Sequence, residues 1–168
     1  MKFTRRQFLL AGATAGAAFV GLGVFDRPGS RALAAATAPF EVTHTDAEWQ
    51  KILTPSQYAV LRREGTERSF SSPLNDEHRA GLFACAGCAL NLFSSKTKFE
   101  SGTGWPSFWQ PLARAVGERS DSTFGISRTE VHCHRCGGHL GHVFDDGPRP
   151  TGLRYCMNGA AMTFKPNA

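Results

Sequence analysis

Residues 81–88 read Gly-Leu-Phe-Ala-Cys-Ala-Gly-Cys, and they combine the two patterns that decide the fold class. Residues 81–84 are a short run of alternating character, which is typical of a β-strand. Cys85 and Cys88 follow at once, and their spacing lets both sulfurs of one turn face the same point. This stretch therefore predicts a strand that ends in a cysteine turn.

The residues before this stretch favour helices. We expect one helix over residues 46–53, with Thr45 or Asp46 as its N-cap. A second helix is expected over residues 55–64, with Gly65 at its C-terminal end.

The residues after position 65 favour strands. Gly, Pro, Ser and Asn recur every few residues, and no long stretch keeps a helical period. Short alternating runs appear instead, for example at residues 125–128 and 162–164. We expect a mainly β domain of antiparallel strands with two short N-terminal helices in front of it.

The distribution of charge excludes one class of partner. The chain has 168 residues, of which 41% are hydrophobic and 20% charged, a composition that suits one compact domain. Its formal charge is +5, but the first 34 positions hold five basic residues and one acidic residue. The remainder has 14 basic and 13 acidic residues, so it has no charge excess that would attract a polyanion. We therefore expect no nucleic-acid partner.

The first 34 residues are organised as an export signal. Residues 1–6 are basic, residues 8–25 are apolar and rich in Ala and Gly, and Ala32 and Ala34 are small residues at the two positions that a signal peptidase reads. Thr4-Arg5-Arg6-Gln7-Phe8-Leu9-Leu10 resembles the twin-arginine export signal. We expect cleavage after Ala34.

This prediction divides the chain into three parts. Residues 1–34 are the twin-arginine signal peptide, residues 35–45 are a linker, and residues 46–168 are the folded domain. The twin-arginine translocase, which exports folded proteins, is then a partner, and the bacterial periplasm is the expected location. An uncleaved amphipathic anchor is the alternative for the first part.

Four of the five cysteines form two C-x-x-C pairs, and these are Cys85, Cys88, Cys133 and Cys136. Paired turns of this kind predict a structural zinc site, because four thiolates leave no coordination position open to water. Gly87 and Gly137 lie where such a turn often needs a positive φ. Two disulfides are the alternative in an oxidising compartment. His132 and His134 are adjacent alternative ligands, although four cysteines suffice.

The fifth cysteine, Cys156, has no second free cysteine to pair with. A buried, inert thiol is the simplest interpretation of a lone cysteine. Arg154 and Asn158 lie two residues to either side, so on a strand both share the face of Cys156. His139 and His142 lie upstream in a glycine-rich run. Cys, His and Asn together suit an activated thiolate, so the residues favour thiol chemistry.

Long motifs in the chain resemble the B-type peptide-methionine (R)-S-oxide reductases. The motifs that carry this resemblance are Gly65-Thr66-Glu67, Leu92-Phe93, residues 102–108 (Gly-Thr-Gly-Trp-Pro-Ser-Phe), residues 138–148 (Gly-His-Leu-Gly-His-Val-Phe-Asp-Asp-Gly-Pro), Pro150-Thr151-Gly152 and residues 154–158 (Arg-Tyr-Cys-Met-Asn). The resemblance covers about residues 46–166. It implies two antiparallel sheets, with zinc on the side away from the active site.

The resemblance also implies a reaction, the reduction of the R epimer of methionine sulfoxide in oxidised proteins. By analogy with the family, the thiolate of Cys156 attacks the sulfoxide sulfur, and methionine and a sulfenic acid on Cys156 result. His139, His142 and Asn158 occupy the family positions that bind and polarise the oxygen.

Three more residues take roles from the resemblance. Trp105 matches the aromatic residue that packs against the methyl group of the substrate, and Phe108 is included with it as a substrate-binding candidate. Taken alone, Phe108 is more typical of a core. Arg154 matches the residue that lowers the pKa of the nucleophile.

The chain departs from the family pattern at Thr103. Many members carry there a resolving cysteine, which attacks the sulfenic acid and forms a disulfide that thioredoxin reduces. Thr103 lacks a thiol, and the other four cysteines are committed to zinc in this interpretation. We therefore expect an external reductant, either a thioredoxin-like protein or a small thiol, to reduce Cys156 directly.

Two other classes of function use similar cysteine turns. A non-catalytic zinc-ribbon-like module would bind a partner, and replacement of Cys156 would leave that binding intact. A zinc hydrolase such as a deaminase would need an open metal position and a nearby general-base Glu, and four cysteine ligands provide no open position.

Overall fold

The computed structural model describes residues 40–122, 125 and 127–167. The expected signal peptide and its cleavage site lie outside these residues. Within them, no helix is both long enough and apolar enough to cross a membrane.

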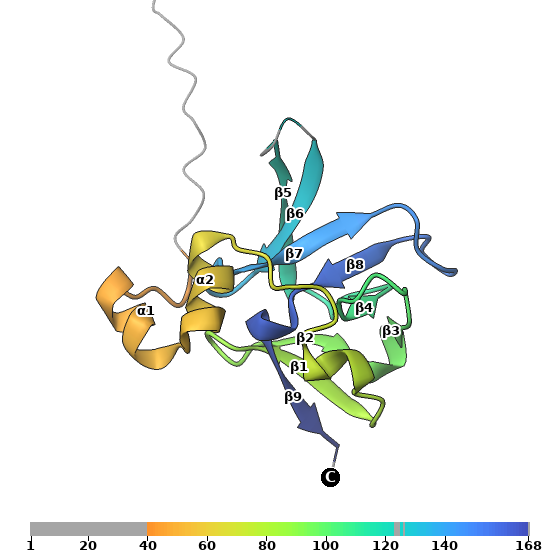
Figure 1. The fold of residues 1–168 in the computed structure, drawn as a ribbon, viewed down its shortest axis with the longest axis horizontal. Coiled ribbons are helices and arrows are strands. Elements are labelled where there is room, and N and C mark those ends of the chain that lie inside the picture. Colours follow the sequence, from red (N-terminus) through yellow and green to blue (C-terminus); the bar gives the residue numbers. More distant parts are fainter. Residues whose placement is uncertain (1–39, 123–124, 126, 168) are drawn as a thin grey trace, which may run out of the picture. The chain divides into compact units, whose positions relative to one another are not determined.

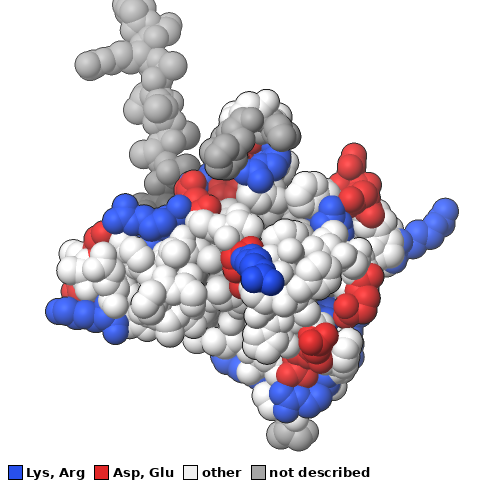
Figure 2. All heavy atoms as spheres, in the orientation of Figure 1, with Lys and Arg blue, Asp and Glu red and all other residues white. Residues whose placement is uncertain are grey.

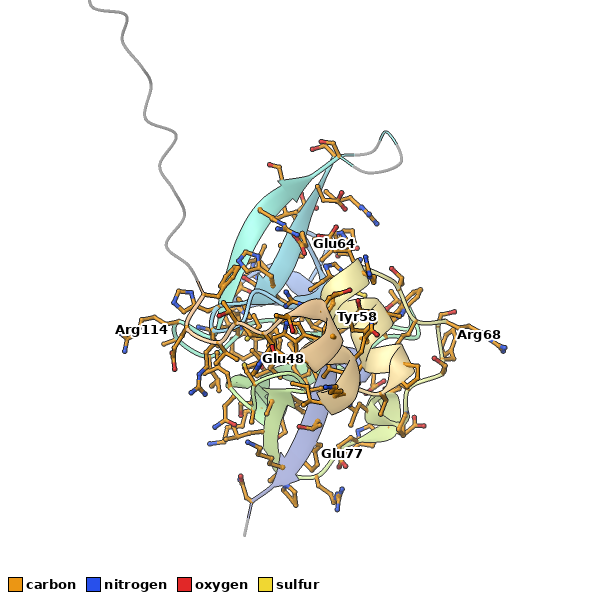
Figure 3. All side chains as sticks on the ribbon, turned by 90° about the vertical axis from the view of Figure 1, so that its left-hand side faces the viewer. Glu48, Tyr58, Glu64, Arg68, Glu77 and Arg114 are labelled. Carbon is orange, nitrogen blue, oxygen red and sulfur yellow. The ribbon has the colours of Figure 1, made fainter. Side chains whose placement is uncertain are left out.

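Two short helices open the described chain, α1 (Asp46–Ile52) and α2 (Pro55–Arg63). Each begins with a capping box. The N-cap side chain accepts a hydrogen bond from the backbone N–H three residues later, and the side chain of that later residue accepts one from the backbone N–H of the N-cap. Thr45 is the N-cap of α1 and Thr54 that of α2. The hydroxyl of Tyr58, labelled in Figure 3, donates to a carboxylate oxygen of Asp46 at 2.6 Å and joins the two helices.

The end of α2 differs from the prediction by one residue. Glu64, rather than Gly65, adopts the left-handed conformation, with φ of 56°. The N–H of Gly65 then donates to the carbonyl of Ala59 at 2.9 Å. The carboxylate of Glu64 binds Arg119 at 2.5 Å, and Figure 3 shows Glu64 between α2 and the strands above it.

The strands form two antiparallel sheets, as the resemblance implied (Figure 1). The three-stranded sheet has the order β2-β1-β9, and its strands are β1 (Gly81–Cys85), β2 (Asn91–Ser94) and β9 (Met162–Pro166). The six-stranded sheet has the order β3-β4-β8-β7-β6-β5, and its strands are β3 (Lys98–Phe99), β4 (Ser107–Phe108), β5 (Val116–Asp121), β6 (Arg128–Cys133), β7 (His139–Phe144) and β8 (Arg154–Met157). Short 3-10 helices lie at η1 (Pro73–Asp76), η2 (Ser95–Thr97) and η4 (Gly159–Ala161).

Two of the three predicted strand runs are confirmed. Residues 81–84 lie in β1 and residues 162–164 lie in β9. The run at 125–128 is wrong as a strand, because β6 begins only at Arg128 and residue 126 lies outside the described residues.

The core lies where aromatic rings from both sheets meet. Phe108 of β4 stacks on Phe93 of β2 with ring centroids 4.3 Å apart, and it meets Phe83 of β1 edge to face at 4.9 Å. All three rings are fully buried. This cluster holds the short strand β4 in place, and β4 lies beside the strand that carries Cys156.

The expected linker is packed on the domain over its described part. The ring of Phe40 meets the ring of His132 edge to face, and the N–H of Val42 donates to the carbonyl of Arg135 at 3.1 Å. Arg135 also binds the carboxylate of Glu41 at 3.0 Å. Residues 40–42 therefore form a strap over the second cysteine turn.

Acidic and basic side chains are interspersed on the surface. Figure 2 shows both signs around the edges of the displayed face, and a mostly uncharged area between them that charged side chains of both signs interrupt near its centre. No single-sign field is visible on this face, in keeping with the near balance of 14 basic and 13 acidic residues after position 34.

Candidate active site and metal centre

The two C-x-x-C turns meet to form one cluster of sulfur atoms. The Sγ atoms of Cys85, Cys88, Cys133 and Cys136 all lie within 4.8 Å of one another. Cys85 and Cys136 are 3.7 Å apart, and Cys88 and Cys133 are 3.5 Å apart. Four sulfurs at about 2.3 Å from a tetrahedral zinc ion would lie about 3.8 Å apart. The cluster therefore fits a four-thiolate metal site, and all four thiols are free, so the disulfide alternative is not what the structure shows.

The two turns close in the same way. The N–H of Ala89 donates to the carbonyl of Cys85 at 2.8 Å, and the N–H of Gly137 donates to that of Cys133 at 2.9 Å. Ala89 and Gly137, each directly after the second cysteine, have φ of 60° and 67°. The prediction for Gly137 is confirmed and that for Gly87 is wrong, because the position that needs a positive φ follows the second cysteine.

The helices cover this cluster. Trp49 of α1 and Leu61 of α2 are buried and lie near Gly87 of the first turn. Arg62 stacks over the Trp49 ring and donates to the carbonyl of Cys136 at 3.1 Å. Among the described residues, neither His132 nor His134 belongs to the cluster, so the site is closed by four cysteines alone.

Cys156 lies in the middle of the six-stranded sheet, away from that cluster. Its register partners are Ser107 on β4 and His142 on β7, so the three side chains share one face of the sheet. A cavity of about 140 Å³ opens there. It is lined by Thr66, Trp105, Arg128, Gly141, His142, Phe144, Cys156 and Asn158.

The surroundings of Cys156 act on its pKa in opposite directions. Burial raises the pKa of the Cys156 thiol, while a contact with the Thr103 hydroxyl and the charge of Arg154 lower it. Thr103 Oγ1 lies 3.8 Å from Cys156 Sγ. Burial dominates, so the pKa stays above the ordinary thiol value, and the expected activation by Arg154 is present but incomplete.

Arg154 interacts with Asp146 as well as with Cys156. Its guanidinium makes a two-point ion pair with Asp146, at 2.8 and 2.7 Å. It also stacks over the Phe144 ring, with its central carbon 4.4 Å from the ring centroid. The ion pair with Asp146 therefore weakens the effect of the Arg154 charge on the sulfur of Cys156.

His142 is held by a carboxylate on β5. Its Nε2 lies 2.8 Å from an oxygen of Asp121, and Arg128 donates to the same oxygen at 2.6 Å. Because a carboxylate accepts, the ring proton is on Nε2. Burial lowers the pKa of His142, although the hydrogen bond to Asp121 opposes this.

His139 is held by a different acid. Its Nδ1 lies 2.7 Å from an oxygen of Glu130, which also pairs with Arg119. Although burial acts against it, these two partners keep the pKa of Glu130 below the ordinary value. His139 is buried, and its Nε2 has no hydrogen-bond partner among the described residues. The two histidine rings lie 5.4 Å apart and line one polar cleft of about 580 Å³ beside the cavity.

Asn158 is fixed at both ends of its amide. Its oxygen accepts from the N–H of Glu67 at 3.0 Å, and its nitrogen donates to the carbonyl of Leu140 at 3.1 Å. The Glu67 carboxylate in turn accepts from the N–H groups of Gly159 and Ala160, at 2.5 and 2.8 Å. The structure places Asn158 in the wall of the cavity with one amide N–H already used.

Trp105 also depends on Glu67. The indole N–H donates to the Glu67 carbonyl at 3.2 Å, which leaves the ring as one side of the cavity. Phe108, in contrast, is fully buried in the aromatic core and does not line the cavity. Its expected place beside the substrate is wrong because Ser107 and Phe108 are neighbours on β4, and only Ser107 faces Cys156.

Several site residues were not foreseen from the sequence. Arg128 lines the cavity and binds Asp121, Glu130 orients His139, and the side chain of Glu67 fixes the loop after Cys156. Glu67 lies in a family-like motif, but nothing in its neighbours along the chain indicates a partner 92 residues away. A thiol, two oriented histidines and an aromatic wall form a site suited to thiol attack on a small polar group.

Comparison with known proteins gives a consistent result. The SelR domain model matches residues 53–166. A protein of Leptospira interrogans named peptide methionine sulfoxide reductase MsrB is 54% identical over 127 residues, which is 75% of this chain and 97% of that protein. Proteins of the same name from Thiobacillus denitrificans and Agrobacterium fabrum are 57% identical over 123 residues (73% of this chain, 93% of that protein) and 54% identical over 131 residues (77% and 96%).

Proposed function

This chain belongs to the SelR-domain family of peptide methionine sulfoxide reductases, and from that premise we propose that Cys156 reduces the R epimer of methionine sulfoxide in oxidised proteins. The observation that carries this proposal is the cavity in which Cys156 lies beside Trp105 and His142. It offers a nucleophile, an apolar wall for the methyl group and a polar side for the oxygen.

The proposed first step moves one oxygen atom. The Cys156 thiolate attacks the sulfoxide sulfur, the sulfur–oxygen bond of the substrate breaks, and the oxygen, with one proton, ends on Cys156 as a sulfenic acid. Methionine is reduced and Cys156 is oxidised. Asp121 holds the Nε2–H of His142 and so orients the ring, and we propose that the other ring nitrogen, when it is protonated, gives its proton to the leaving oxygen.

The proposed second step uses an external thiol. All four other cysteines lie in the metal cluster, so the described residues place no resolving thiol beside Cys156. We propose that a thioredoxin-like protein or a small thiol reduces the sulfenic acid. Two thiols are oxidised to a disulfide, and water leaves.

We propose zinc as the ion of the four-cysteine cluster. Four sulfurs and the observed spacings suit zinc, and a bound ion would cross-link the turn after β1 to the turn after β6. Its role would be structural, since none of the four ligands lines the cavity at Cys156.

We also propose export through the twin-arginine pathway to the periplasm, on the motif at residues 4–10 alone. Replacement of Arg5 and Arg6 by Lys is expected to keep the protein in the cytoplasm at its full, uncleaved length. Fractionation with an antibody would test this, and unchanged export would contradict it.

The reaction is tested with separated R and S epimers of a methionine sulfoxide peptide, with dithiothreitol as reductant. We expect loss of the R epimer alone, and no turnover by Cys156→Ser. Metal content and circular dichroism of that variant should match those of the native protein, which shows that the fold is kept. Equal turnover by Cys156→Ser would overturn the assignment of the nucleophile.

A further inference from the structure

A row of three hydroxyl groups leads away from the sulfur of Cys156. Thr103 Oγ1 lies 3.8 Å from Cys156 Sγ, and Ser101 Oγ lies 2.8 Å from Thr103 Oγ1. Ser101 Oγ is also 2.7 Å from Ser107 Oγ, which donates to the carbonyl oxygen of Trp105 at 3.1 Å. The row therefore ends on a group that can only accept.

Because the Trp105 carbonyl can only accept, it fixes the direction of every hydrogen bond in the row when Cys156 is a thiol. The hydroxyl proton of Ser107 is used on the Trp105 carbonyl, so Ser101 must donate to Ser107. Thr103 must then donate to Ser101, and the S–H of Cys156 donates to Thr103. All four hydrogen bonds run away from the sulfur.

We propose that Thr103, Ser101 and Ser107 are positioning residues that reverse together when Cys156 loses its proton. In the reversed chain Ser107 donates to Ser101, Ser101 donates to Thr103, and Thr103 donates to the thiolate. Only hydroxyl groups rotate, and the proton of Cys156 leaves through the cavity that the sulfur lines. The chain thus supplies a hydrogen bond to the sulfur in both protonation states.

Ser101 has the bonding capacity that such a reversal needs. The backbone N–H of Thr103 points to Ser101 Oγ at 3.4 Å and occupies one of its acceptor positions in either direction. The hydroxyl of Ser101 then donates to one of its two neighbours, Ser107 or Thr103, and accepts from the other. All three hydroxyls keep a partner in either state, while the Trp105 carbonyl loses its hydrogen bond from Ser107 in the reversed state.

Other groups around the sulfur give only partial support to a thiolate. Arg154 on β8 is paired with Asp146, while His142 on β7 and Arg128 on β6 are both bound to Asp121. Burial raises the pKa of Cys156, and contacts with Thr103 and Ser107 act against it. The hydroxyls of the row therefore support the sulfur directly, together with Arg154.

This inference rests on the proposed function, because it concerns the sulfur that we propose attacks the substrate. Its test needs no sulfoxide. The zinc-loaded protein is alkylated with iodoacetamide from pH 6 to pH 10, and mass spectrometry follows the peptide that carries Cys156. The measured quantity is the apparent pKa of that thiol, together with the limiting rate at high pH.

We expect Thr103→Val to slow alkylation of Cys156 about tenfold at pH 7, which corresponds to a rise of about one unit in its apparent pKa, with no change in the limiting rate at high pH. Ser101→Ala, which removes a group with no contact to the sulfur, should slow it in the same direction by about threefold. Thr103→Ser keeps the hydroxyl and should behave as the native protein. Thr163→Val, at an exposed position of β9, is the matched control.

Two outcomes overturn the proposal. A Ser101→Ala profile that superposes on the native profile would show that the hydroxyls do not act as a chain. Equal slowing at every pH would show that they govern access to the sulfur and not its ionisation. If the profiles shift as expected but no sulfoxide is reduced, the chain stands and the proposed function fails.

Discussion

Two regions of this protein use cysteine in opposite ways. In the four-cysteine cluster the sulfurs lie within 4.8 Å of one another, and Trp49, Leu61 and Arg62 cover the turns that carry them. Cys156 is the only cysteine on its cavity, where the Thr103 hydroxyl lies 3.8 Å from its sulfur and His142 lines the same wall. One region brings four sulfurs together in a closed site, and the other leaves one sulfur accessible from a cavity.

The difference shows that the neighbours of a thiol decide its role. Cysteines that share one closed site have no position left for substrate, so they stabilise the fold. A cysteine that faces a cavity, hydroxyl groups and a cation can ionise and attack. In the function that we propose, the same side chain serves structure in one region and chemistry in the other.

The largest expected effect separates the two regions by stability. Cys133→Ser removes one ligand of the cluster and should abolish metal binding, with a loss of several kcal/mol in the free energy of unfolding or loss of folding altogether. Cys156→Ser should keep both. Metal analysis and urea denaturation measure these quantities. A native unfolding midpoint for Cys133→Ser would show that the cluster is not a metal centre.

The next expected effect comes from placing a second thiol beside Cys156, so that this sulfur, like those of the cluster, has another sulfur as its neighbour. Thr103→Cys places a thiol where a hydroxyl now lies 3.8 Å from Cys156 Sγ. After one turnover without reductant, we expect a disulfide between position 103 and Cys156 in the variant and a sulfenic acid in the native protein. Intact-mass spectrometry distinguishes the two products. Thr103→Ser is the control, and a lasting sulfenic acid in Thr103→Cys would contradict the geometry.

A smaller effect is expected at the support of the open region. Glu67→Gln keeps the shape of the side chain but loses one of the two acceptors for Gly159 and Ala160. We expect a loss of about 2 kcal/mol in stability and a raised KM, because Asn158 and Trp105 both bind the backbone of Glu67. Glu41→Gln, at an ion pair with Arg135 that is exposed on both sides, should change little. Equal effects of the two variants would remove Glu67 from the site.

The smallest expected effect concerns the dependence of Cys156 on pH. The Arg154 charge favours the thiolate, so Arg154→Gln should raise the pKa of Cys156 further and leave less thiolate at neutral pH. Turnover should fall about threefold at pH 7 and recover as the pH rises, because the pair with Asp146 already limits the effect of Arg154. A pH–rate profile tests this. A drop that persists at high pH would point to a role other than ionisation.

The sequence predicted those features of the fold and the site that depend on spacing along the chain. The two cysteine turns, the two capped helices and the first and last strands follow from residues that are neighbours in the sequence. Cys156 was singled out because four cysteines were already paired. In each case the deciding contact lies within a few residues.

The features that were missed depend on pairing between distant residues. Ser107 and Phe108 are adjacent, and only the register of β4 with β8 decides that Ser107 faces the cavity and Phe108 the core. Glu67 binds Gly159 across 92 positions, and Glu130 reaches His139 only after β6 and β7 pair. Such contacts depend on how distant segments pack together, and a sequence pattern over a few neighbouring residues does not predict them.

The contact between Cys85 and Cys136 has a consequence for how the chain reaches its fold. These residues are 51 positions apart, and β2 to β6 all lie in the loop between them. Closing a flexible loop of this length costs on the order of 3 to 4 kcal/mol in chain entropy. If an ion binds both turns before the strands pair, metal binding offsets this entropy loss early. The strands then pair across a shorter effective separation along the chain. Refolding should therefore run faster when zinc is present from the start than when it is added last, and a protein exported in its folded state, as we propose here, would gain from having the metal early.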